Sequence, residues 1–154
     1  MKKELAVEIK KYIESDRKPL ADGYVRFLSL DSIENVTDIV SDSDIWNDGI
    51  PFATTVFGDV LAWEDGYVVL YDFTMQDYNV INSGAEFFFS NLKDVDYQND
   101  YFDMTVFREA VEKLGTINED ECYSIEPLPV LGGERSIKYL NKSDLDEYLR
   151  FLVS

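Results

Sequence analysis

The chain has 154 residues and a mass of 17.8 kDa, and 45% of its residues are hydrophobic and 14% aromatic. This size and apolar content exclude a disordered chain and predict a single domain over residues 1–154. Acidic residues number 31 against 14 basic ones, which gives a net charge of −17, and the sequence contains no histidine. The charge disfavours binding to nucleic acid or to an anionic membrane, and the lack of histidine removes the usual general base of enzymes.

Targeting signals and cysteine chemistry are also constrained by the sequence. No apolar run approaches the roughly 20 residues that span a bilayer, and the N-terminal residues lead into no signal-peptide core. We therefore expect a cytoplasmic protein. Cys122 is the sole cysteine, so the sequence allows no internal disulfide bond and no zinc site built from cysteines alone. We expect no cofactor.

The first fifty residues predict a helix, a short strand and a second helix. Apolar side chains from Leu5 to Ile13 recur at helical spacing. Residues 24–28 favour a strand. Residues 31–34, Asp-Ser-Ile-Glu, place a capping Asp three positions before a Glu and predict a helix that begins there and runs to Val40. A polar, acidic loop should follow over residues 41–49.

The central part of the chain is rich in β-forming residues and predicts an antiparallel meander. The strand-forming residues from 54 to 63 are interrupted by Gly58, which we interpret as a bulge or bend. Asp65-Gly66 suits the positive φ angles of a tight hairpin turn. Residues 67–73 then favour an interior strand, and residues 79–82 favour another.

Helical spacing returns in the last part of the chain. Ser83 is a candidate cap for a helix, and a longer helix is expected over residues 103–114. Residues 122–125 and 129–131 favour short extended pieces, and Ser143 is the candidate start of a terminal helix. A central antiparallel sheet with helices at the N-terminus, in the middle and at the C-terminus places the chain in the α+β class.

Clustered carboxylates suggest two alternative kinds of site, a calcium-binding loop and the carboxylate pair of a glycosidase. The loop over residues 42–49 resembles the start of a calcium loop, but its later ligand positions lack the required oxygens, and residues 94–105 fail in the same way. A carboxylate pair could serve a glycosidase, yet a chain with 31 acidic residues always offers such pairs. We therefore expect no catalytic residue and no metal site. A carboxylate-dependent hydrolase and a calcium-binding module remain alternatives.

Two acidic segments are the predicted partner-binding surface, because they combine charge with aromatic side chains that can anchor a partner. Their residues are Asp42, Asp44, Asp48, Asp94, Asp96, Tyr97, Asp100, Tyr101 and Asp103. Residues 21–107 hold seventeen acidic and two basic residues, so the acidity belongs to the middle of the chain. A field of this sign favours a basic protein partner.

Residues from Pro51 to the C-terminus resemble a known bacterial family. The most specific feature is the pattern Tyr-x-x-x-Pro-x-x-x-Leu-Gly-Gly from Tyr123 to Gly133. Phe57-Gly58-Asp59 precedes it, and the helical stretch 145–152 follows it. This part is similar to the C-terminal domain of immunity proteins that accompany secreted toxins, including DNase effectors of type VI secretion. Related groups are described as GAD-like and SUKH.

This resemblance implies a division of the chain and a function. Residues 51–154 would form the immunity-type portion, and residues 1–50 a shortened form of the N-terminal domain that longer members carry. The implied protein is not an enzyme. It binds a cognate toxin, with a nuclease effector as one partner class, and neutralises it by occluding its active site. A SUKH-type interaction or regulatory adaptor is the alternative that the same resemblance allows.

Overall fold

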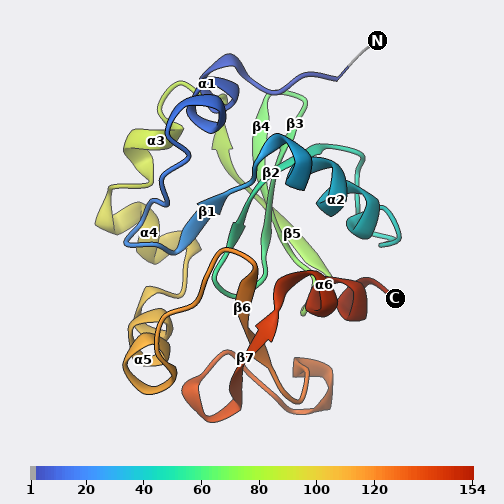
Figure 1. Cartoon of the computed structure of the whole chain (residues 1–154), viewed down its shortest axis with the longest axis vertical. Helices are drawn as coiled ribbons and strands as arrows, with labels where there is room; N and C mark the ends of the chain where they lie inside the picture. The colour runs from blue at the N-terminus through green and yellow to red at the C-terminus, as the bar shows by residue number, and fades with distance from the viewer. Residues whose placement is uncertain (1–2) are drawn as a thin grey trace.

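The computed structural model describes residues 3–154 and contains a five-stranded antiparallel sheet flanked by helices (Figure 1). The strands are β1 (Val25–Phe27), β2 (Ile50–Thr55), β3 (Val60–Glu64), β4 (Tyr67–Asp72) and β5 (Asp77–Ser83). Each strand pairs with the next one along the chain, so the predicted meander is confirmed, with β3 at its centre. Asp65 and Gly66 form the hairpin turn between β3 and β4 with φ angles of +49° and +89°.

Helices precede and follow the sheet, and the α+β class is confirmed. They are α1 (Val7–Ser15), α2 (Leu30–Val40), α3 (Phe88–Asn91), α4 (Val95–Tyr101), α5 (Met104–Leu114) and α6 (Leu145–Val153). A second, two-stranded sheet pairs β6 (Glu121–Ile125) with β7 (Leu140–Asp144), and the 3₁₀ turns η1 (Pro129–Leu131) and η2 (Ile137–Tyr139) lie between these strands. None of the helices in residues 3–154 is long and apolar enough to cross a bilayer.

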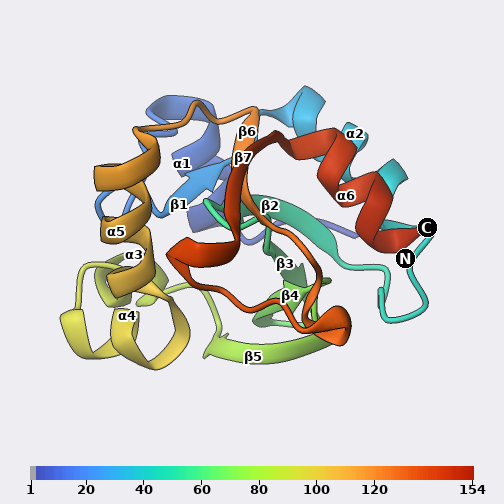
Figure 2. The same ribbon diagram turned by 90° about the horizontal axis from the view of Figure 1, so that it is seen from below.

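The helices cover both faces of the meander. Apolar side chains of α1, α3 and α5 pack on one face, against residues such as Phe27 and Phe52. On the other face α2 and α6 lie against each other and pack on Val69 and Tyr71 (Figure 2). The β6–β7 sheet lies between α5 and α6 at one end of the meander. Residues from both halves of the chain therefore complete the core on each face.

Two arginines attach the second sheet to the meander, and the first, Arg26, is buried. From β1 its guanidinium donates hydrogen bonds to the backbone oxygens of Asn118 (3.2 Å) and Glu121 (2.9 Å) and to Oγ1 of Thr54 (3.1 Å). Burial lowers the pKa of Arg26 to about 10. Within residues 3–154 its Nε atom has no hydrogen-bond partner.

Arg135, in the connection between β6 and β7, makes the second attachment. Its two terminal nitrogens donate to the carboxylate of Asp59 at 2.9 and 3.2 Å, and one of them also donates to Asp103 at 2.9 Å. The guanidinium lies over the ring of Phe57, 4.9 Å from its centre. Burial raises the pKa of the Asp59 carboxyl, and the charge of Arg135 opposes that rise. Arg135 therefore compensates for a carboxylate that is only 3% exposed.

The starts of three helices differ from the sequence-based expectations. Ser29, not Asp31, caps α2, because its hydroxyl accepts the backbone N–H three positions further on at 3.1 Å. Ser83 belongs to β5, and α3 begins five residues later without a side-chain cap. Ser143 lies in β7, and Asp144 is the residue that caps α6. For α2 and α6, the side-chain oxygen that satisfies the first free N–H groups marks where the helix begins.

The extended and loop regions agree with the sequence-based expectations in part. Gly58 lies in the bend between β2 and β3, with φ of +83°, so the bend is confirmed and the alternative of a bulge is not. The irregularity in register lies instead between Pro51 and Ala53. Residues 129–131 form a 3₁₀ turn and not an extended piece. The strand β7 and the helix α4 were not predicted.

Candidate functional site

The predicted segment that begins at Asp94 forms α4 and contributes structural contacts as well as charge. The Asp94 carboxylate caps the helix by accepting the backbone N–H groups of Asp96 (2.8 Å) and Tyr97 (3.3 Å). Tyr97 is half-buried, its hydroxyl donates to the backbone oxygen of Ile81 at 2.9 Å, and burial raises its pKa. The Tyr101 ring lies edge-on to Tyr97 at 4.9 Å. Both tyrosines therefore help to hold α4 on the fold.

The remaining acidic residues of this segment differ in their availability to a partner. Asp96 and Asp100 are exposed on α4. Asp103 lies at the start of α5 and forms an ion pair with Arg135 at 2.9 Å, so its charge is largely committed within the protein. The free charge of the segment is therefore concentrated at Asp96 and Asp100.

The predicted loop after α2 carries exposed Asp42, Asp44 and Asp48. Figures 1 and 2 place α2 with this loop and α4 on opposite sides of the molecule. The structure therefore does not bring the two predicted acidic segments together.

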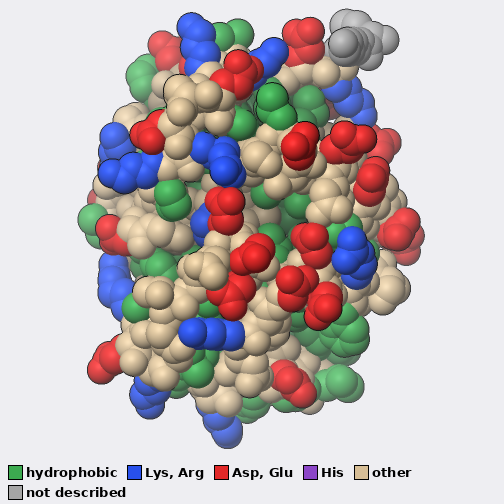
Figure 3. Space-filling view, in the orientation of Figure 1, with side chains coloured by type: hydrophobic (Ala, Val, Ile, Leu, Met, Phe, Trp, Pro, Cys, Tyr) green, Lys and Arg blue, Asp and Glu red, His purple; other side chains and the backbone are tan. Residues whose placement is uncertain are grey.

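A larger acidic surface, which the sequence-based reasoning missed, lies over α2 and α6. It consists of Asp31, Glu34, Asp38, Asp146 and Glu147, and we call it the acidic helix face. The side-chain amide of Asn35 on α2 donates to the Asp146 carboxylate at 2.8 Å and joins the two helices. Figure 3 shows acidic side chains gathered over these helices. The spacing of the α2 acids is visible in the sequence, but the neighbouring position of α6 comes only from the tertiary structure.

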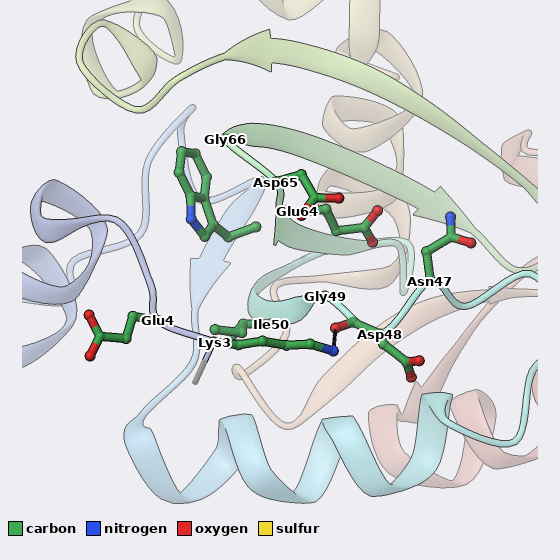
Figure 4. A pocket seen from close by; sticks show the side chains of 10 residues that line it. Lys3, Glu4, Asn47, Asp48, Gly49, Ile50, Glu64, Asp65 and Gly66 are labelled. Carbon is green, nitrogen blue, oxygen red and sulfur yellow. Dashed lines mark hydrogen bonds between the residues drawn. The ribbon is translucent and has the colours of Figure 1, made fainter. Parts of the chain in front are cut away.

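A polar pocket of about 450 Å³ lies between the loop before β2 and the turn between β3 and β4 (Figure 4). Glu64 lines it and accepts a hydrogen bond from the Tyr71 hydroxyl. Burial raises the pKa of Glu64, and the bond from Tyr71 opposes that rise. The Lys3 ammonium donates to the backbone oxygen of Asp48, and a Cβ atom on Gly49 would lie 2.3 Å from Cγ of Glu64. Packing and hydrogen bonding inside the protein thus explain the position of Glu64, and burial explains its raised pKa.

Metal coordination receives no support from the geometry. Among the described residues, no three side chains of the types His, Cys, Asp or Glu are grouped as potential metal ligands. The acidic residues instead cap helices, bond to Arg135 or lie separately on the surface. Their arrangement is that of a charged protein surface.

The combination of a five-stranded meander, helices on both faces and a small second sheet is shared with a solved structure. The crystal structure of Atu4351 from Agrobacterium tumefaciens matches 99% of this chain and 81% of its own, with a TM-score of 0.62 and 16% sequence identity. This likeness shows a common fold. A comparison with curated proteins gives no match.

Residues 82–154 match the family described as "T6SS immunity protein Tdi1, C-terminal". The matched part begins at the end of β5, runs through α6 and contains the pattern from Tyr123 to Gly133. The match supports a type VI secretion immunity family and confirms the predicted resemblance over these residues. The resemblance proposed for residues 51–81 lies outside the matched part.

Proposed function

We propose that this protein is an immunity protein that binds a cognate type VI secretion effector and neutralises it by occluding the effector's active site. The match of residues 82–154 to an immunity family is the observation that carries the proposal. Such a protein requires a surface complementary to its target and no catalytic group of its own. We therefore assign it a binding function and no enzymatic one.

The charge of the surface supports a basic partner. The chain carries a net charge of −17, and the acidic helix face concentrates part of it on two adjacent helices. Opposite charge on a partner raises the rate of encounter and fixes its orientation. A nuclease effector fits this requirement, because an enzyme that binds nucleic-acid phosphates presents basic side chains. We include the loop with Asp42, Asp44 and Asp48 in the proposed contact surface, and treat α4 as a second acidic surface that acts through the long-range field.

Protection of cells tests the proposal directly. We expect the gene for the effector to lie beside the gene for this protein; the product of that neighbouring gene is expressed in sensitive cells with and without the protein, and survival is measured. We expect protection, and we expect the purified protein to form a stoichiometric complex with a catalytically inactive form of that effector. Survival that does not change on co-expression, together with no complex, would contradict the proposed function.

Two matched charge reversals separate the acidic surfaces. Asp38→Lys with Asp42→Lys changes the acidic helix face and its adjoining loop, and Asp96→Lys with Asp100→Lys changes α4 by the same net charge. We expect the first pair to slow association more, with a difference that shrinks as salt shortens the screening length below about 8 Å. A larger effect of the α4 pair would assign the contact to the opposite side of the molecule.

A further inference from the structure

An apolar groove of about 420 Å³ lies between α6 and the segment that follows β6. Tyr148 and Phe151 line it from α6, and Leu128 and Leu131 line it from the opposite side. The backbone N–H of Ile125 donates to the Tyr148 hydroxyl oxygen at 3.1 Å, which fixes α6 against β6. Both walls of the groove are therefore attached to the folded core.

The pattern from Tyr123 to Gly133 shapes one wall of this groove. The backbone N–H of Gly133 donates to the oxygen of Leu128 at 3.1 Å. A Cβ atom on Gly133 would lie 1.7 Å from the backbone oxygen of Pro127, and Gly132 has a φ of +100°. Only residues without a side chain allow this close return of the chain. The two glycines therefore hold the wall in place and leave its apolar side chains facing outward.

Large apolar side chains are unusually exposed at the groove. Val130 is 85% exposed, Leu131 74% and Phe151 63%. In Figure 3 apolar side chains gather below the acidic area, on the side where α6 and the β6–β7 connection lie. Grouped apolar exposure of this kind, when bordered by polar residues, is typical of a protein interaction site.

The border of the groove carries acidic side chains and meets the acidic helix face at Glu147. Glu126 lines the groove, and Glu147 lies one helical turn before Phe151 on α6. The complementary ligand is an apolar side chain flanked by lysine or arginine. A second copy of this chain is disfavoured, because it would bring together two molecules that each carry a net charge of −17.

We propose that the groove receives an apolar side chain from a basic segment of the effector and that this contact anchors the complex. The inference rests on the proposed function and adds the place and the chemistry of contact. An apolar centre with a charged rim is the usual anatomy of a protein interface. In this arrangement the acidic helix face speeds association and the groove slows dissociation.

Dissociation kinetics test this division. Leu131→Ser with Phe151→Ser removes one apolar side chain from each wall of the groove. Phe87→Ser is a matched control, because Phe87 is 64% exposed and directly precedes α3, which lies on the other side of the molecule from α6. With the immobilised inactive effector, we expect the double variant to dissociate about 10- to 100-fold faster at both low and high salt. The control should dissociate within about 3-fold of the unchanged protein. Leu131→Ser alone provides a second measurement if the double variant proves less stable, because Leu131 lines the groove and is 74% exposed.

The possible results distinguish the proposed function, the groove as a contact site for the effector, and self-association of the protein. If the unchanged protein does not bind the effector, both the proposed function and the groove assignment are overturned. If it binds and the double variant dissociates at the same rate, the groove assignment alone fails. Sedimentation of the protein without effector gives the third outcome, because self-association that the double variant abolishes would make a second copy the occupant.

Discussion

Replacement of Arg135 by alanine tests whether the buried ion pair holds the two sheets together. Arg135 makes both hydrogen bonds to Asp59 and a further bond to Asp103, while Asp59 keeps only the Thr55 hydroxyl at 2.8 Å after the change. Removal of one partner of a buried pair leaves an uncompensated charge and costs about 3–5 kcal/mol. We therefore expect Arg135→Ala to lower the free energy of unfolding by about 3–5 kcal/mol.

Urea denaturation followed by tryptophan fluorescence measures this loss. The probes are Trp46, which is buried against Tyr71, and Trp63, which is partly buried in β3. With a slope of about 1–3 kcal/mol per molar urea, the midpoint should fall by roughly 1–3 M. Arg108→Ala is the matched control, because it removes the same charge from the exposed surface of α5 and should change stability by less than about 0.5 kcal/mol.

The pH dependence and a double variant complete this test. Without Arg135, the pKa of Asp59 in the folded protein should rise further above its value in the unfolded chain. The loss of stability is then full above the folded pKa, shrinks as pH falls from that pKa toward the unfolded value of about 3.9, and is absent below it. Asp59→Asn in the Arg135→Ala background should restore much of the stability at neutral pH. Equal losses for Arg135→Ala and Arg108→Ala would refute the reasoning.

Three other changes have defined outcomes. Glu64→Gln should raise the urea midpoint at pH 7, because burial raises the pKa of Glu64 and the Gln side chain can still accept the hydrogen bond from Tyr71. This gain in stability should vanish below about pH 4, and a gain that persists at pH 3 would contradict the proposed cause. Gly58→Ala should cost about 1–2 kcal/mol in the same assay, since φ is +83° and the new Cβ atom would lie 3.2 Å from the Tyr148 ring; an unchanged midpoint would show that the turn adapts. Cys122 should react with iodoacetamide at pH 8 far more slowly in the folded than in the unfolded protein, because burial raises its pKa to about 12; equal rates would show that the thiol is accessible.

The meander could be predicted from the sequence because its determinants are local. Alternating β-forming residues and the Asp65-Gly66 turn lie within a few positions of the pairs that they specify. The strand β7, with sequence Leu-Asn-Lys-Ser-Asp, has no such signal and forms because β6 pairs with it across a long connection. The bond between Asp59 and Arg135 joins residues that are 76 positions apart. Contacts of this range depend on the assembled fold and leave no pattern in a short window of sequence.

The candidate site was predictable only in part for the same reason. The exposed acidic loop with Asp42 and Asp44 was found from its composition, whereas the acidic helix face requires α2 and α6 to be neighbours. The pattern from Tyr123 to Gly133 was recognised as a sequence feature. Its effect on the shape of the groove follows from the contact between Gly133 and Pro127, which only the structure reveals.

The shared construction of the two cores has a consequence for folding during synthesis. The meander is complete at Ser83, but its faces are covered by Tyr123 and Leu140 on one side and by Leu145 and Leu149 on the other. A nascent chain that has released only the residues up to the end of the meander therefore leaves part of each apolar face uncovered, because α1 and α2 cover only part of them, and the second face is complete only when α6 has left the ribosome. Such a chain is prone to aggregation, and its final, cooperative folding step must follow translation of the C-terminal helix.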